Sequence, residues 1–194
     1  MAATDARRRA VFLDRDGVIV EEVNFLHRVE DLRLLPGAAQ AIRKLNLSRC
    51  LAIVVTNQSV VARNLCTLDQ LEEIHARMRG LLDAEGARLD AVYFCPHHPG
   101  TGALGANREF EVECDCRKPK TGMIERAKRD FSIDLAHSFM IGDTPADIQC
   151  GRNAGLGTIA VRTGHPWPAS VEAPDRFCED LAEAVELILK GPPP

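Results

Sequence analysis

The chain has 194 residues, of which 45% are apolar and 27% charged, and its formal net charge is −4. These values exclude the disordered and fibrous classes, and the mild acidity argues against a nucleic-acid binder with a basic surface. The longest apolar run, Cys50 to Val55, is far shorter than the roughly 20 residues of a membrane helix. Asp14 interrupts the apolar stretch behind the N-terminal arginines, so we expect no signal peptide and a cytoplasmic protein without membrane partners.

Short apolar runs alternate with amphipathic segments of helical length, which is typical of βαβ units on a parallel sheet. The pattern predicts strands at 10–13, 51–55, 91–94, 138–141 and 158–161. It predicts helices that begin after Gly37, at Thr67 and at Gly122, and further helices at 146–154 and 181–190. We therefore expect an α/β fold, in which residues 1–194 form one domain with a Rossmann-like parallel sheet and helices on both faces.

Residues 95–120 form a polar stretch that is too long for an ordinary connection in a compact domain. It contains three of the seven cysteines, and an odd number of cysteines speaks against a disulfide framework. Three thiolates and one imidazole make a closed tetrahedral zinc site, so we expect structural Zn²⁺ in the loop 95–118. The expected ligands are Cys95, His97, Cys114 and Cys116, with His98 as the alternative to His97.

The other four cysteines stand alone in apolar or amphipathic segments. Free cysteine is among the most frequently buried residue types, so we expect these four to be small packing residues. They are Cys50, Cys66, Cys150 and Cys178.

Polar motifs follow three of the predicted strands, at the sheet edge where open parallel sheets bind ligands. They are Asp14-Arg15-Asp16-Gly17, Thr56-Asn57-Gln58-Ser59 and Gly142-Asp143, with Asp147 one helical turn after the last. Each motif alone is also typical of a solvated turn or a helix cap. Together with Lys118 they supply oxygen ligands for Mg²⁺, an ammonium for phosphate oxygens and a carboxylate that can attack phosphorus.

These spaced motifs resemble those of the haloacid dehalogenase-like phosphotransferase superfamily. The resemblance implies that Asp14 is a nucleophile that forms an aspartyl-phosphate. It implies that Asp16 first protonates the leaving alkoxide and then activates water as a base. Asp14, the backbone carbonyl of Asp16, and Asp143 would hold Mg²⁺.

The same resemblance assigns the remaining polar residues. Thr56 and the backbone N–H of Asn57 would hold phosphate, and Lys118 would offset the charge of phosphate and nucleophile. Asp147 would orient the site without touching the metal. Because a leaving-group acid has no use in dehalogenation, Asp16 favours a phosphatase over a dehalogenase.

The cysteine loop narrows the resemblance to the D-glycero-D-manno-heptose 1,7-bisphosphate 7-phosphatases and, more distantly, to the histidinol-phosphate phosphatases. It implies a capless enzyme that removes the 7-phosphate in ADP- or GDP-heptose biosynthesis for lipopolysaccharide or surface glycans. Arg117 would contact the substrate and assist catalysis beside Lys118. Further substrate contacts would come from Glu22, Val23, Asn24 and Phe25, and from Thr56, Asn57, Gln58 and Ser59.

The chain departs from these families at three positions. Val60 and Asn64 stand where glycine is usual, and a positive φ would strain Val60. Thr144 stands where heptose enzymes often carry lysine, which leaves Arg63 and Arg117 as the cations for a second phosphate. These departures put the substrate in question but leave the phosphoryl chemistry unchanged.

Three alternatives therefore stay open at the level of sequence. The first is a phosphatase of histidinol phosphate or another small sugar phosphate. The second is a phosphotransferase that passes the phosphoryl group to an acceptor other than water. The third is a non-enzymatic zinc scaffold, which the intact acidic motifs and Lys118 disfavour. We expect a monomer.

Overall fold

The computed structural model describes residues 8–100, 102 and 104–191. The described residues form a six-stranded sheet in the order β3-β2-β1-β4-β5-β6, and neighbouring strands are parallel throughout. The strands are β1 (Ala10–Leu13), β2 (Leu51–Asn57), β3 (Ala91–Cys95), β4 (Phe139–Gly142), β5 (Gly157–Val161) and β6 (Arg176–Cys178). The five strands expected from the sequence are present, with ends that differ by no more than two residues.

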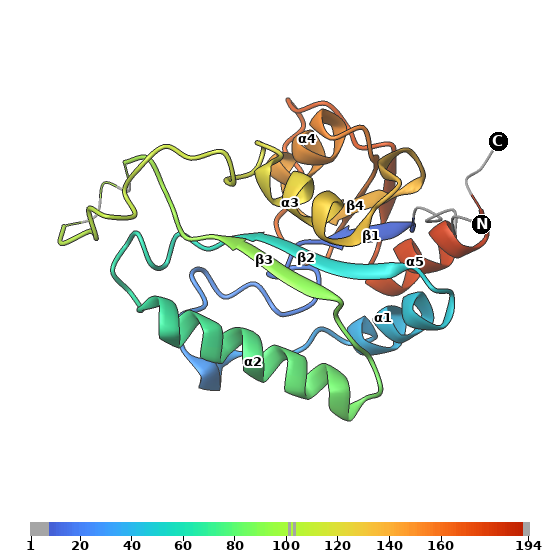
Figure 1. Ribbon diagram of the computed structural model, residues 1–194, viewed down its shortest axis with the longest axis horizontal. Coiled ribbons are helices and arrows are strands. Elements are labelled where there is room, and N and C mark those ends of the chain that lie inside the picture. The colour runs from blue at the N-terminus through green and yellow to red at the C-terminus, as the bar shows by residue number, and fades with distance from the viewer. Residues whose placement is uncertain (1–7, 101, 103, 192–194) are drawn as a thin grey trace, which may run out of the picture.

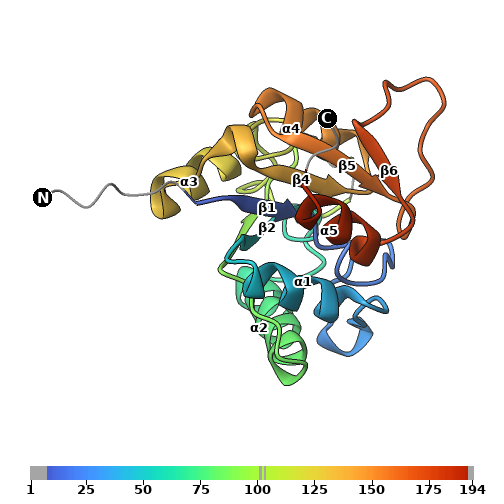
Figure 2. The same ribbon diagram turned by 90° about the vertical axis from the view of Figure 1, so that its right-hand side faces the viewer.

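Helices cover both faces of this sheet (Figures 1 and 2). On one face lie α1 (Ala38–Leu47), α2 (Leu68–Ala84) and α5 (Leu181–Leu189), and on the other lie α3 (Gly122–Phe131) and α4 (Pro145–Asn153). Short 3-10 helices span Val29–Asp31 and Leu135–His137. The predicted α/β class with a Rossmann-like parallel sheet is confirmed.

Alternation along β1 explains why both faces are covered. Val11 and Leu13 belong to the apolar cluster under α1, α2 and α5, whereas Ala10 and Phe12 belong to the cluster under α3 and α4. All four residues are at most 1% exposed. Since successive side chains of a strand point to opposite faces, a strand buried on both sides reads as a continuous apolar run.

Strand β6 was not expected from the sequence. It has three residues, of which two are exposed, and it pairs with Ile159–Val161 of β5 at the sheet edge. So short and exposed a segment has no apolar periodicity, which is why the pattern does not reveal it. Between β5 and β6 the chain makes an excursion over residues 162–175, which Figure 2 shows as the long orange loop.

The four isolated cysteines are buried, as predicted, with exposed fractions between 1% and 8%, and all are free thiols. No helix of the described residues is long and apolar enough to cross a membrane. The predicted single domain begins and ends outside the described residues, and it stays a prediction.

Candidate active site

The acidic motifs meet because β1 and β4 are neighbours at the point where the strand order reverses. Leu13 is in register with Ile141, and the backbone N–H of Asp14 donates to the carbonyl of Ile141 at 2.9 Å. Asp14 therefore leaves the end of β1 beside Asp143, which follows β4. The carboxylates of Asp14, Asp143 and Asp147 lie within 4.8 Å of one another.

Lys118 is buried and pairs with two of these carboxylates. Its Nζ is 3.0 Å from Asp14 Oδ1 and 2.5 Å from Asp147 Oδ1, and it donates to the carbonyl of Val55 at 2.8 Å. Burial alone lowers the pKa of Lys118, but the charges and hydrogen bonds of the two aspartates outweigh it and raise that pKa above its ordinary value. Lys118 is therefore a fixed positive charge beside Asp14.

Two sets of hydrogen bonds hold Lys118 and Asp147 in place. The side chain of Asn57 donates to the carbonyl of Lys118 and accepts from its N–H, at 3.1 and 3.0 Å. Asp147 Oδ2 accepts from the N–H and hydroxyl of Thr144 in a capping box at the start of α4. Thr144, which stands where related enzymes often carry lysine, is thus a helix cap.

Asp143 has one oxygen fully engaged and one available. Its Oδ2 accepts from the backbone N–H of His165 at 2.9 Å and pairs with the ring Nδ1 of His165 at 2.7 Å. Its Oδ1 is buried and has no hydrogen-bond partner. Burial, followed by the charges of Asp14 and Asp147, raises the pKa of Asp143 to about 6. A buried, unpartnered carboxylate oxygen among like charges fits a divalent cation.

His165 was missed at the level of sequence, because it belongs to the loop after β5 and no motif marks it. The approach of this loop requires glycine: a Cβ on Gly164 would collide with the Asp143 carboxylate. Gly17, which has φ +72°, approaches the same carboxylate next to Gly164.

Asp16 lines a cavity of about 210 Å³. The other lining residues are Glu22, Asn24, Phe25, Leu26, Asn57, Gln58, Ser59, Val60 and His165. Val23 does not line this cavity and is exposed beside a neighbouring hollow. Thr56 is buried behind Gln58, whose Nε2 donates to the Thr56 hydroxyl at 2.9 Å.

The two positions where glycine was expected behave differently. Asn64 has φ 58°, a conformation that asparagine tolerates better than most residues. Val60 has no positive φ and is buried, so the strain considered for it does not arise. Arg63 lies between them, with its guanidinium 4.5 Å from the centroid of the Phe25 ring.

The cysteine loop extends from the end of β3 and is visible as the long yellow-green segment of Figure 1. Cys95 Sγ lies 3.5 Å from Cys114 Sγ, 3.1 Å from Cys116 Sγ and 3.7 Å from His97 Nδ1. A zinc ion with Zn–S bonds of about 2.3 Å at tetrahedral angles places sulfurs about 3.8 Å apart, so this donor set fits zinc. The hydrogen bond between Cys95 and Cys116 lowers the pKa of Cys116 to about 5 and raises the pKa of Cys95.

His97, and not His98, belongs to this cluster. The backbone carbonyl of His97 also accepts from the Arg117 guanidinium at 3.1 Å. The loop thereby holds Arg117 next to Lys118.

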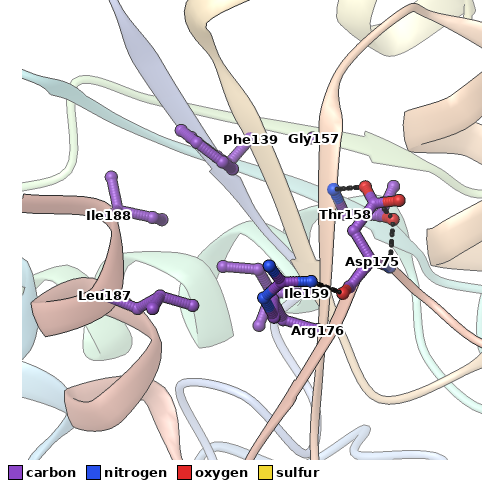
Figure 3. A pocket seen from close by; sticks show the side chains of 8 residues that line it. All are labelled: Phe139, Gly157, Thr158, Ile159, Asp175, Arg176, Leu187 and Ile188. Atoms are coloured by element: carbon purple, nitrogen blue, oxygen red, sulfur yellow. Dashed lines mark hydrogen bonds between the residues drawn. The ribbon is translucent and has the colours of Figure 1, made fainter. Parts of the chain in front are cut away.

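A different pocket, of about 170 Å³, lies between the sheet and α5 (Figure 3). Phe139, Ile159, Leu187 and Ile188 line it, and Asp175 at its rim is paired with Thr158. Phe139 begins β4, so this pocket lies towards the amino ends of the strands. It is therefore separate from the aspartate cluster, which follows their carboxyl ends.

Comparison with known proteins agrees with this geometry. Residues 115–184 match the family model described as HAD-hydrolase-like, where HAD denotes haloacid dehalogenase. The chain is 44% identical over 190 residues to the D-glycero-D-manno-heptose-1,7-bisphosphate 7-phosphatase of Thermosynechococcus vestitus, covering 93% of this chain and 95% of that protein. It is 39% identical over 181 residues to the D-glycero-beta-D-manno-heptose-1,7-bisphosphate 7-phosphatase of Yersinia pestis, covering 92% and 94%.

A solved structure shows the same fold. It is the D,D-heptose 1,7-bisphosphate phosphatase of B. bronchiseptica, complexed with magnesium and phosphate, which matches with a TM-score of 0.80 and 32% identity. The match covers 94% of this chain and 98% of that one. The chain therefore belongs to the haloacid dehalogenase-like hydrolases, and within them to the family of the D-glycero-D-manno-heptose-1,7-bisphosphate 7-phosphatases.

Proposed function

We propose that the chain is a Mg²⁺-dependent phosphomonoesterase that removes the 7-phosphate of D-glycero-D-manno-heptose 1,7-bisphosphate, in the cytoplasmic synthesis of ADP- or GDP-heptose. The observation that carries this proposal is the placement of Asp14 close to both Lys118 and Asp143 at the carboxyl end of the sheet, with Asp16 lining the adjacent cavity. The relatives named above carry the same activity in their names.

Mg²⁺ would be held by Asp14, the backbone carbonyl of Asp16, and Asp143. The free, buried Oδ1 of Asp143 supports this ligand set. The ion would supply positive charge between an anionic nucleophile and an anionic phosphate. Asp147 is committed to Lys118 and Thr144, so its role is to orient Lys118.

The covalent step belongs to Asp14. One of its oxygens forms a bond to phosphorus while the bond from phosphorus to the sugar oxygen breaks, and Asp16 donates a proton to that oxygen. Water then attacks phosphorus and gives its proton to Asp16, while the bond from phosphorus to Asp14 breaks, which releases inorganic phosphate and restores the Asp14 carboxylate. Thr56, the N–H of Asn57, and Lys118 would hold the transferring phosphoryl oxygens, as positioned charge and hydrogen-bond donors do in phosphoryl transfer.

Zn²⁺ would be held by Cys95, His97, Cys114 and Cys116. Four protein ligands leave no open position for water, so this zinc is structural. Its contribution to activity is indirect, because the anchored loop carries Arg117 and Lys118.

The substrate would be held beyond the phosphoryl group by the residues around the cavity. Glu22, Asn24, Phe25, Gln58 and Ser59 line it, and Val23 belongs to the same segment. Arg117 and Arg63 are the cations proposed for the distal phosphate.

A phosphate-release assay on a substrate panel tests this function. The panel comprises heptose 1,7-bisphosphate, histidinol phosphate, fructose 1,6-bisphosphate and 4-nitrophenyl phosphate, each with Mg²⁺. We expect the heptose bisphosphate to have the highest kcat/KM and to yield one phosphate and the 1-phosphate. Preference for histidinol phosphate would contradict the assignment, and absence of release from every member would contradict the enzyme itself.

A further inference from the structure

A buried guanidinium lies directly behind Asp16. Arg15 stands between the two aspartates of the first motif, but its side chain points into the interior and is fully buried. Its Nε and one terminal nitrogen donate to both oxygens of Asp16, at distances between 2.8 and 3.2 Å. This two-pronged contact fixes the plane of the carboxylate as well as its position.

Gln58, which directly follows β2, contacts both residues of this Arg15–Asp16 clamp. Its Oε1 accepts from Arg15 at 2.8 Å, and its Nε2 donates to Asp16 Oδ2 at 2.8 Å and to the Thr56 hydroxyl at 2.9 Å. The position of Asp16 is thus tied to that of Thr56, a residue proposed to hold phosphate.

The remaining edge of the guanidinium meets His75 of α2. The Nε2 of His75 lies 3.4 Å from the free terminal nitrogen of Arg15. Since arginine can only donate, Nε2 must accept and the imidazole proton must be on Nδ1. The ring is fully buried and packs against Phe94, with ring centroids 5.1 Å apart.

The imidazole is neutral at ordinary assay pH. Burial, followed by the charges of Arg15 and Arg79, lowers the pKa of His75 to about 3, while Glu72 lies 3.7 Å from Nδ1. A neutral acceptor stabilises the orientation of Arg15 without competing with Asp16 for its charge. Nothing in the proposed chemistry otherwise requires a buried histidine on α2, because His75 does not line the cavity.

We propose that His75 is a positioning residue, which holds the guanidinium of Arg15 and thereby aligns the Asp16 carboxylate with the leaving-group oxygen. This inference rests on the proposed function, in which Asp16 exchanges a proton with that oxygen. Loss of the His75 acceptor frees one edge of Arg15, and the clamped carboxylate can then turn with it. Misplacement of a proton donor affects a reaction in proportion to how much the leaving group needs the proton.

Two variants and two substrates test this role. His75→Leu removes the acceptor, whereas His75→Gln places an amide oxygen where Nε2 lies. The sugar phosphate leaves as a basic alkoxide that needs a proton, whereas 4-nitrophenyl phosphate leaves as a stable phenolate. Because Asp16 also serves in hydrolysis of the aspartyl-phosphate, which both substrates share, the comparison uses kcat/KM, which reports only the steps up to departure of the leaving group. We expect His75→Leu to lower kcat/KM for the sugar phosphate about 10- to 100-fold and kcat/KM for the aryl phosphate less than about threefold. His75→Gln should recover most of the sugar-phosphate kcat/KM.

The ratio of the two kcat/KM values decides the outcome, because it does not depend on how much of a variant is folded. Ile74→Ala is the matched control: it opens space beside His75 in the apolar cluster on this face of the sheet and removes no polar group, and it should keep the wild-type ratio. An unchanged ratio in His75→Leu, or a failure of His75→Gln to restore it, would overturn the positioning role.

The experiment also separates this inference from the proposed substrate. If the wild type rejects the heptose bisphosphate but hydrolyses another alkyl phosphate, the substrate assignment fails and the ratio is measured with that alkyl phosphate. If the wild type hydrolyses aryl phosphates alone, Asp16 is not a leaving-group acid, and the positioning role of His75 fails with it.

Discussion

At the scale of single residues, the chemistry depends on the charge of Asp14. Its Oδ1 receives the N–H of Arg15 at 2.7 Å and lies 3.0 Å from Lys118 Nζ, so the carboxylate is held in one orientation. Asp14→Asn keeps the shape but removes the anionic nucleophile. We expect kcat to fall by at least roughly 10³-fold and the acid-stable phosphoenzyme to disappear.

Phosphate release and the mass of acid-quenched protein would measure these two effects. Asp69→Asn, an exposed change in the first turn of α2, is the control and should behave as wild type. If Asp14→Asn retained a tenth of the wild-type rate, the covalent route would be refuted.

The lowered pKa of His75 also predicts how the stability of the protein depends on pH. Its pKa is lowered from 6.5 to about 3 in the folded chain, because the ring is buried and faces Arg15 and Arg79. Between these two pKa values, His75 is protonated in the unfolded chain but not in the folded chain. The free energy of unfolding therefore falls as the pH falls from about 6.5 towards 3. At pH 5 this loss amounts to about 2 kcal/mol.

Urea unfolding of wild type and His75→Gln at pH 7.5 and at pH 5 measures this term. We expect the free energy of unfolding to fall by about 2 kcal/mol less in the variant, since the loss from carboxylates is common to both. His137→Gln, a change at an exposed histidine, is the control. Parallel profiles for wild type and His75→Gln would show that the ring titrates alike in both states.

At the scale of elements, the 95–120 loop is a long segment that must be ordered by something other than an apolar core. Its described residues, which leave out 101 and 103, form no helix or strand beyond Cys95, yet its end carries Lys118 into the buried aspartate cluster. The cysteine and histidine side chains near the two ends of the loop lie close enough to bind one metal ion, which would hold these ends together. Metal binding that orders such a segment contributes directly to the free energy of folding.

Cys114→Ala tests this contribution. We expect wild-type protein to contain one zinc per chain, and the variant to lose it together with roughly 3 kcal/mol of stability. Elemental analysis and thermal unfolding measure both. Cys178→Ala removes a thiol from the packed core and should leave the zinc content at the wild-type level. Zinc retained in Cys114→Ala, or a wild type that keeps its Tm after complete zinc removal, would contradict a structural zinc site.

At the scale of the whole molecule, residues that directly follow strands were predictable from the sequence. Parallel strands bring their carboxyl ends to one edge, so Asp14 and Asp143 had to approach once the strands were identified. The path of a long connection is not encoded in this way. His165 comes from the excursion between β5 and β6, and its contact with Asp143 depends on packing that leaves no local pattern.

The same limit applies to groups behind the site. Arg15 reads as a charged turn residue and His75 as a polar position on an amphipathic helix. Only the tertiary arrangement shows that both are buried and face each other. Val60 shows the reverse case, since the glycine usual in related families suggested strain that the backbone does not have.

The charge of the assembled site leads to a prediction about the whole protein. Asp14, Asp143 and Asp147 lie close together, and Lys118 pairs with only Asp14 and Asp147, so this excess of negative charge destabilises the folded state until a cation binds. Mg²⁺ should therefore stabilise the protein, by about 2.7 kcal/mol at a concentration 100 times its Kd. Thermal unfolding after dialysis against Mg²⁺-free buffer, followed by Mg²⁺ titration, measures this without a chelator that would also remove zinc. We expect the Tm to rise with Mg²⁺ in wild type and in Asp69→Asn, and to stay flat in Asp143→Asn. A Tm that ignores Mg²⁺ in wild type, or rises equally in Asp143→Asn, would contradict a magnesium site at this cluster.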